Sequence, residues 1–269
     1  MNPAAGPAPG KTPEPDTVTC VTDRPLLILV HGTRFDARQW RGYDTLVPDA
    51  ELLPIDLPGH GSRAGDPWDS AAALDVVDDA VRTAGPDRPI VLAGHSLGGY
   101  VATTYAHRHP DRLAALVLVG ACADPSKHPR LVYLYTGFAR LLPLIGADRM
   151  ATVANAVMRR LGAQAQDVPD ATGYAATPAA WAGVVAEARA DQLAPVTCPV
   201  YLVAGQYDQL RIDLAAYARA CRDGRTRVIP RASHLAPVTH RAQVAEVFRE
   251  AVAAATAPED PSQNPPSNA

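Results

Sequence analysis

The sequence of 269 residues has little of several features that mark common classes of protein. It contains only 4 cysteines, and Cys20, Cys122, Cys198 and Cys221 are too widely spaced for a Cys-x-x-Cys site or a dense disulfide scaffold. The histidines show no zinc-like spacing with carboxylates or cysteines. We therefore expect ordinary thiols, no metal ion and no cofactor.

An excess of charge of one sign is also absent, since the formal net charge is −3 with 20% charged residues. The arginines are scattered, so no basic patch for nucleic acid is indicated. Nothing approaches the roughly 18 consecutive apolar residues of a membrane helix, and Met1–Asp16 has no apolar core of a signal peptide. These absences predict a soluble, cytoplasmic protein that acts on a small molecule and binds neither nucleic acid nor membrane. They leave its oligomeric state open.

Short runs of leucine and β-branched residues recur along the chain and predict strands. Most of these runs are continuous, as expected for strands buried between helices on both faces of a parallel sheet. This pattern predicts the α/β class. The expected buried strands are Val18–Thr22, Leu26–Val30, Leu52–Leu57, Ile90–Ala93, Leu116–Val119, Val200–Ala204 and Arg227–Ile229.

Helical patterns separate these strands. Asp36 with Gln39 resembles a capping pair and predicts a helix through Leu46, and Asp69 predicts the start of another helix. A further helix is expected from Ser96 to about residue 109, and the last one over Val238–Ala255.

The alternation of strands and helices stops after Gly120. Between Ala121 and Pro195 only apolar helical stretches are evident, and this length exceeds the need of one crossover. We expect residues 17–120 and 196–256 to form one α/β core, with residues 121–195 as a helical cap. Residues 1–16 and 257–269 are poor in apolar side chains and are predicted to be disordered tails.

Ser96 lies in the sequence Gly94-His95-Ser96-Leu97-Gly98, which follows an apolar run and opens a helix-compatible segment. Such a Gly-x-Ser-x-Gly turn between strand and helix lifts a serine hydroxyl out of the sheet as a nucleophile. We expect glycine at Gly94 and Gly98 because neighbouring backbones pass too close for a Cβ.

A serine nucleophile needs a base, and His234 follows the last expected strand. Asp208 follows the preceding strand and could orient the imidazole. Loops after parallel strands meet at one sheet edge, so these residues can approach Ser96. Asp213 and Asp124 are alternatives for the acid.

Two other histidines are alternatives to His234 as the base. His240, on an expected helix, is a weaker substitute, and His95 is expected to pack rather than react. The tetrahedral intermediate also needs hydrogen-bond donors, which we assign to the backbone N–H groups of Leu97 and Thr33. Thr33 follows the strand Leu26–Val30, and Leu97 opens the helix after Ser96.

Taken together, five ordered motifs resemble those of the α/β-hydrolase superfamily, specifically its small cap-bearing serine esterase, perhydrolase and carbon–carbon hydrolase branch. They are His31-Gly32, Asp56-Leu57-Pro58-Gly59-His60-Gly61, Gly94 to Gly99, Gly205-x-x-Asp208 and Ser233-His234. The resemblance covers about residues 17–256 and implies the α/β-hydrolase fold. In such proteins the loop from Asp56 to Gly61 shapes the site without a catalytic group. The family sheet usually begins with two strands before the His-Gly strand, and only Val18–Thr22 is evident here.

The resemblance leaves three functions open. Ser96 in the turn between strand and helix, the nucleophile elbow, argues against haloalkane dehalogenases and epoxide hydrolases, which use aspartate at this position. The leading hypothesis is hydrolysis of a carboxylic ester of a small apolar or aromatic substrate through an acyl-enzyme. Carbon–carbon hydrolysis or cofactor-free perhydrolysis by the same triad, and a non-catalytic ligand-binding role, are the alternatives. No substrate-binding residue is assigned, but an apolar pocket lining is suggested by Leu131, Tyr133, Tyr135, Phe138, Leu141, Leu142, Leu144 and Ile145.

Overall fold

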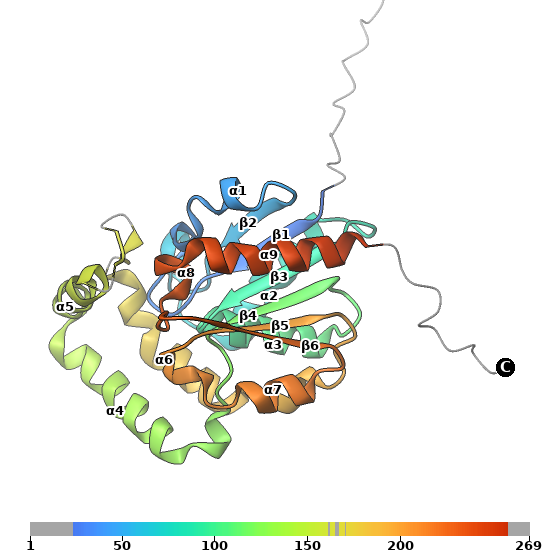
Figure 1. Cartoon of the computed structure of the whole chain (residues 1–269). Coiled ribbons are helices and arrows are strands. Elements are labelled where there is room, and N and C mark those ends of the chain that lie inside the picture. The colour runs from blue at the N-terminus through green and yellow to red at the C-terminus, as the bar shows by residue number, and fades with distance from the viewer. Residues whose placement is uncertain (1–23, 161, 165–166, 170, 258–269) are drawn as a thin grey trace, which may run out of the picture.

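The structure, a computed structural model, describes residues 24–160, 162–164, 167–169 and 171–257. Within this part of the chain one six-stranded sheet has the order β2-β1-β3-β4-β5-β6, and every neighbouring pair is parallel (Figure 1). Parallel strands need crossovers, and most of these crossovers contain helices. The expected strand Val18–Thr22 lies outside the described residues, as do Cys20 and nearly all of both expected tails.

The elements follow one another in strand–helix alternation. The strands are β1 Leu26–Val30, β2 Glu51–Ile55, β3 Ile90–His95, β4 Ala115–Val119, β5 Val200–Gly205 and β6 Gly224–Ile229. The α-helices are α1 Tyr43–Leu46, α2 Ser70–Thr83, α3 Leu97–Arg108, α4 Pro129–Ile145, α5 Ala147–Arg160, α6 Thr172–Glu187, α7 Leu214–Ala220, α8 Ala236–Thr239 and α9 Arg241–Thr256.

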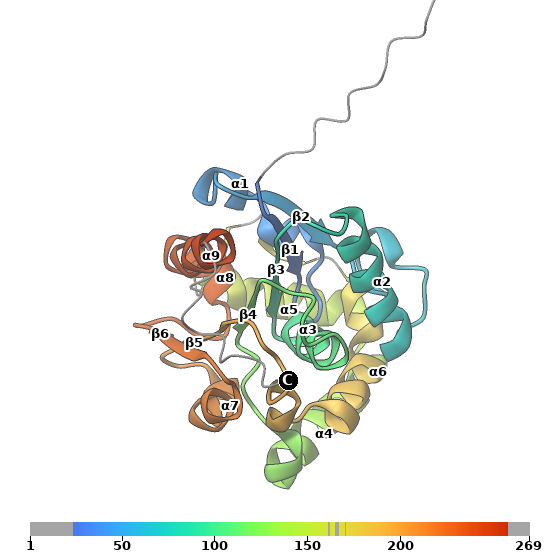
Figure 2. The same cartoon turned by 90° about the vertical axis from the view of Figure 1, so that its right-hand side faces the viewer.

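Helices cover both faces of the sheet (Figure 2). Leu26 and Ile28 of β1 face a core shared with α2, α3 and α7, whereas Leu27 and Leu29 face a core shared with α1 and α9. Each successive side chain of β1 is therefore buried, which explains its unbroken apolar sequence. The expected α/β fold with a mostly parallel sheet is confirmed.

The two edge strands differ from the expected buried strands. In β6, residues Gly224 to Val228 are exposed, and β2 is half-buried except for exposed Glu51. The expectation that Arg227–Ile229 is a buried strand was wrong for Arg227 and Val228, because β6 pairs on one side only and is exposed there, whereas Ile229 is buried.

Two expected helices are each divided. Asp36 does accept a hydrogen bond from the Arg38 N–H, but the helix it begins is a short 3-10 turn, Ala37–Trp40. Gly42, at φ 79°, separates this turn from α1. The last expected helix is likewise broken at His240, which is not helical (φ −132°) and separates α8 from α9. By contrast, Asp69 caps α2 as expected, accepting from the Ala72 N–H.

Between β4 and β5 the chain adds α4, α5 and α6, and no strand occurs among the described residues 121–195. In Figure 1 these helices extend to one side of the sheet, with α4 and α5 outermost. The second half of α6 packs into the main core through Ala180 and Val184. No described helix is long and apolar enough to cross a membrane.

Candidate active site

The functional residues expected from the sequence converge at the carboxyl edge of the sheet. Ser96 directly follows β3, Asp208 lies in the loop after β5, and His234 lies in the loop after β6. The last two loops are in contact because a Cβ on Gly205 would collide with the backbone of Ser233. The close approach of these loops brings Asp208 and His234 together.

Ser96 has the strained backbone expected of a nucleophile elbow. Its φ is 50° and its ψ is −114°, a conformation that costs free energy for a residue with a Cβ. The glycines on both sides are required by space. A Cβ on Gly94 would collide with the carbonyl group of Gly98, and a Cβ on Gly98 would collide with the carbonyl oxygen of Val30.

The side chains of Ser96, His234 and Asp208 form a continuous hydrogen-bonded row. Nε2 of His234 lies 2.9 Å from Oγ of Ser96, and Nδ1 lies 2.9 Å from Oδ1 of Asp208. With the imidazole neutral and protonated on Nδ1, it donates to Asp208 and accepts from the serine hydroxyl. This arrangement allows His234 to remove the Ser96 proton.

Asp208 is held in its charged form. Burial would raise the pKa of this carboxyl, but the hydrogen bond and charge of His234, together with the Leu210 N–H, outweigh burial and lower the pKa below its ordinary value. A buried carboxylate beside the ring stabilises the imidazolium that forms when His234 accepts a proton.

The other candidate acids contact different groups. The Asp213 carboxylate accepts from the Asp124 N–H at 2.8 Å and lies 2.8 Å from Nε2 of His128. Asp124 itself caps a short turn by accepting from Ser126. Neither carboxylate has a hydrogen bond with His234 among the described residues. His240 contacts Thr239 instead of Ser96.

The two backbone amides assigned to the oxyanion are unoccupied by other groups. Within the described part of the chain, the N–H groups of Thr33 and Leu97 donate to no hydrogen-bond acceptor. The neighbouring Gly32 N–H donates instead to Oε1 of Gln39 at 3.1 Å, which fixes the loop that carries Thr33. Leu97 is the first residue of α3, where free N–H groups favour negative charge.

A pocket of about 130 Å³ opens onto Ser96 and His234. Aromatic side chains of two helices form part of its wall, because the rings of Tyr135 on α4 and Trp181 on α6 lie 5.1 Å apart. The other lining residues are Thr33, Arg34, Thr177, Gln209 and Leu210.

The expected apolar lining from α4 is largely wrong. Tyr135 does line the pocket, but Tyr133 and Leu144 are 83% and 81% exposed, and Leu141 and Ile145 are exposed as well. The structure does not describe the side chains of Leu131, Phe138 and Leu142. Because α4 is an outer helix, most of its described apolar side chains face away from the site. Trp181 and Thr177 of α6 were not anticipated.

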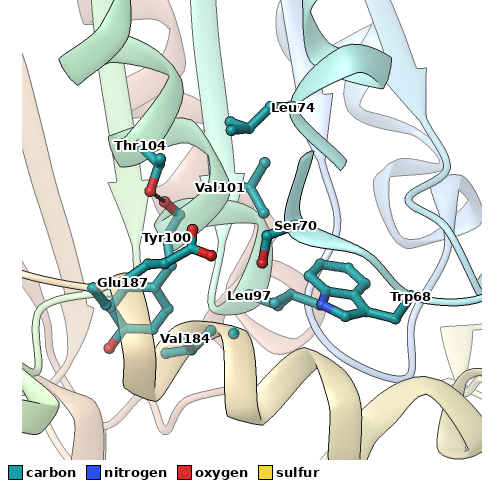
Figure 3. Close-up of a pocket in the computed structure, with 11 residues that line it drawn as sticks. Trp68, Ser70, Leu74, Leu97, Tyr100, Val101, Thr104, Val184 and Glu187 are labelled. Atoms are coloured by element: carbon teal, nitrogen blue, oxygen red, sulfur yellow. Dashed lines mark hydrogen bonds between the residues drawn. The ribbon is translucent and has the colours of Figure 1, made fainter. Parts of the chain in front are cut away.

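A second hollow lies between α2, α3 and α6 (Figure 3). Trp68, Ser70 and Glu187 converge there from a loop, α2 and α6. Neither Ser96 nor His234 lines it, and so it is separate from the pocket at these two residues, here called the reaction pocket.

The loop expected to shape the site, Asp56 to Gly61, begins with a carboxylate that binds the backbone of two other residues. The Asp56 carboxylate accepts from the Ala37 N–H at 2.7 Å and from the Ser62 N–H at 2.8 Å. The rings of His60 and His31 are in contact at a tilt of 51°, with centroids 4.9 Å apart. Within the described residues no group of three or more His, Cys, Asp or Glu is placed to hold a metal ion.

Comparison with known proteins identifies the family. Residues 27–247 match the family described as "Alpha/beta hydrolase family". The chain belongs to this family. This α/β-hydrolase is 34% identical over 99 residues to 2-succinyl-6-hydroxy-2,4-cyclohexadiene-1-carboxylate synthase of Enterobacter sp. (strain 638), covering 36% of the chain and 37% of that protein.

Two further comparisons cover more of this α/β-hydrolase. It is 30% identical to pimeloyl-[acyl-carrier protein] methyl ester esterase of Aromatoleum aromaticum, covering 56% of the chain and 68% of the relative. A thermophilic esterase from Thermogutta terrifontis has a similar structure, with a TM-score of 0.67, 24% identity, and coverage of 87% of this chain and 91% of that chain. The last likeness shows the fold alone.

Gly120 directly follows β4 in this α/β-hydrolase and lies beside Asp208 and His234. None of the five sequence motifs had indicated it. Its φ is 62°, and a Cβ there would lie 2.8 Å from Oδ2 of Asp208 and 3.0 Å from Nδ1 of His234. We expect Gly120→Ala to displace this pair and to lower kcat/KM about 100-fold, because small misplacements of reacting groups are costly. Gly85→Ala is the matched control, since Gly85 has φ 75° with nothing within 4 Å of its Cβ position. Equal activity of the two variants would contradict the assigned role.

His95 packs against His234, as expected. Its Nε2 lies 3.0 Å from the backbone oxygen of His234, and the two rings are in contact at a tilt of 40°, with centroids 5.0 Å apart. Burial, with the neighbouring His234, lowers the pKa of His95 to about 3. Burial, with the neighbouring His60, lowers the pKa of His31 to about 4. Both rings are therefore neutral at pH 7.

These two buried histidines predict acid sensitivity. Their folded-state pKa values lie below the ordinary value of 6.5, so their contribution to stability is complete above that value and falls as pH decreases. Between pH 7 and 5 we expect each to reduce the free energy of unfolding by about 2 kcal/mol, measured by urea denaturation at both pH values. His95→Gln should remove its share of the difference, whereas His109→Gln, at an exposed position, should leave the difference unchanged. The same difference in wild type and His95→Gln would refute this account.

Proposed function

We propose that this α/β-hydrolase is a serine hydrolase that cleaves a carboxylic ester of a small substrate. The single observation that carries the proposal is the row of hydrogen bonds from Ser96 through His234 to Asp208. The strained elbow, the two free amides and the adjoining pocket support it. The ester-cleaving activity named for the relative from Aromatoleum aromaticum also supports it.

The reaction begins with attack by Ser96. Oγ of Ser96 forms a bond to the ester carbonyl carbon while Nε2 of His234 takes the hydroxyl proton. The carbonyl oxygen becomes an oxyanion that accepts hydrogen bonds from the N–H groups of Thr33 and Leu97. When the intermediate collapses, His234 gives its proton to the departing alcohol, and an acyl-enzyme remains.

Water completes the reaction by the same steps in reverse order. His234 takes a proton from water as the water oxygen attacks the acyl carbon. Collapse of the second intermediate releases the acid and returns the proton to Ser96. Asp208 stays ionised throughout and stabilises the imidazolium. Residues 121–195 act as the cap, with Tyr135 and Trp181 contacting the apolar part of the substrate.

A series of p-nitrophenyl esters, from acetate to octanoate, tests the proposal. We expect hydrolysis with an optimum at short chain length, because a pocket of about 130 Å³ leaves little room for a long acyl chain. Absence of p-nitrophenol release above background from every ester would contradict ester hydrolysis. Carbon–carbon hydrolysis or perhydrolysis by the same three side chains would then be favoured if Ser96 still reacted with a fluorophosphonate.

A further inference from the structure

Arg34 lines the same pocket as Ser96 and His234. It directly follows Thr33, the residue whose N–H is assigned to the oxyanion, and it is half-buried. The remaining described lining residues are neutral, apart from the ionisable His234. Burial raises the pKa of Tyr135, another lining residue, and the positive charge of Arg34 opposes this shift. A permanent positive charge therefore belongs to the wall of this pocket.

Arg34 has no acidic partner among the described residues. Arginines elsewhere do form such pairs, including Arg241 with Asp167 at 2.6 Å and Arg88 with Glu51 at 2.7 Å. The guanidinium of Arg34 lies instead over the ring of Tyr174, 5.4 Å from its centroid. A guanidinium carries five N–H donors in a planar fork that matches a carboxylate. Arg34 also interacts with the Tyr174 hydroxyl, but a hydroxyl oxygen has only two acceptor lone pairs, so other donors of the fork stay available to a ligand.

The backbone holds Arg34 in an unfavourable conformation. Its φ is 73°, in the left-handed region that favours glycine. Helix α6 packs directly against it, because a Cβ on Gly173 would lie 2.6 Å from both Cα and the carbonyl oxygen of Arg34. Strain that the surrounding structure maintains is concentrated at functional positions. The packing fixes the backbone that carries the Arg34 side chain.

We propose that Arg34 binds a carboxylate of the substrate, so that the preferred substrates are esters that also carry a free carboxylate. This inference rests on the proposed ester hydrolysis and names its substrate class. The apolar part of such a substrate would lie against Tyr135 and Trp181, and its carboxylate would pair with Arg34. Charge-assisted hydrogen bonds from arginine to carboxylate are roughly twice as strong as neutral ones and are frequently bidentate.

Pairs of esters of similar size, in which one member is charged and the other is neutral, test this inference. Mono-p-nitrophenyl glutarate is compared with p-nitrophenyl pentanoate, which places the carboxylate on the acyl side. A second pair, 4-acetoxybenzoate and its methyl ester, places the carboxylate on the alcohol side. We expect kcat/KM to be about 10- to 100-fold higher for the charged member of one pair. The pair that shows the preference identifies the side of the ester that faces Arg34.

Variants then assign the preference to Arg34. Arg34→Gln should abolish the preference by lowering kcat/KM for the charged ester about 10- to 100-fold, chiefly through KM, with much less change for the neutral ester. Arg34→Lys, which keeps the charge but not the planar fork, should retain part of it. Arg82→Gln, on the exposed surface of α2, is the matched control and should leave the preference intact. Retention of the full preference in Arg34→Gln would overturn the inference.

The inference and the proposed function fail in different ways. Wild-type protein that hydrolyses charged and neutral esters equally would refute carboxylate binding by Arg34 while ester hydrolysis stands. Wild-type protein that hydrolyses none of the four esters would contradict ester hydrolysis. Binding is then measured separately by calorimetry with glutarate and 4-hydroxybenzoate on Ser96→Ala. Binding of either that Arg34→Gln abolishes would sustain the carboxylate site, and no binding of either would refute it.

Discussion

Ser96→Ala is expected to lower kcat/KM for p-nitrophenyl esters by about 10⁴- to 10⁶-fold, because loss of the nucleophile removes the covalent path. The hydroxyl removed lies 2.9 Å from Nε2 of His234, and no other serine is hydrogen-bonded to that nitrogen among the described residues. The measurement is initial-rate kinetics, with circular dichroism to establish that the variant is folded.

Ser70→Ala is the matched control for this substitution. Ser70 lines the second hollow with Trp68 and Glu187 rather than the reaction pocket. We expect its kcat/KM to remain within about threefold of wild type, because surface-proximal changes away from the reacting groups have small effects. Comparable losses in Ser70→Ala and Ser96→Ala would show that the reaction pocket has been misassigned.

Asp208→Asn is expected to lower kcat/KM by about 10⁴-fold while leaving the fold intact. The Leu210 N–H and Nδ1 of His234 both contact Oδ1 of Asp208, so an asparagine amide that donates to Nδ1 gives up the Leu210 hydrogen bond. Asparagine cannot stabilise the imidazolium by charge, and it permits the unproductive tautomer of His234. The kinetics are measured on the same esters as for Ser96→Ala.

Asp213→Asn separates the two candidate acids. Asp213 contacts the Asp124 N–H and His128, not His234. We expect this variant to lose about 1 kcal/mol of stability or less, as for one largely buried hydrogen-bonded carboxylate, and to keep kcat/KM within about threefold. A greater loss of activity in Asp213→Asn than in Asp208→Asn would exchange their roles.

The arrangement of Ser96, Asp208 and His234 could be predicted from the sequence because it depends on topology. Each residue follows a strand, and the parallel sheet brings all those strand ends to one edge. This prediction did not depend on the exact length of each strand. The strand predicted over Arg227–Ile229 was too short and was wrongly described as buried at Arg227 and Val228, yet His234 still follows the carboxyl end of β6.

The lining of the pocket could not be predicted in the same way. Which face of α4 meets the core depends on how α4 packs against α6, and its sequence carries apolar residues on more than one face. Tyr135 therefore faces the pocket while Tyr133 faces solvent. Arg34 and Gly120 were missed for a related reason, since only tertiary contacts show that one faces the pocket and the other leaves room for the His234–Asp208 pair. A glycine directly after a buried strand was the one available signal for Gly120.

Covalent labelling tests the central claim, that Ser96 is the nucleophile, most directly. Attack by Oγ of Ser96 on the phosphorus of an alkyl fluorophosphonate displaces fluoride and leaves a phosphonylated serine, which mass spectrometry of the digested protein locates. The account predicts one label per chain, on the peptide that contains Ser96, with labelling lost in Ser96→Ala and strongly slowed in Asp208→Asn. A label on another residue, or equal labelling of wild type and Ser96→Ala, would contradict it.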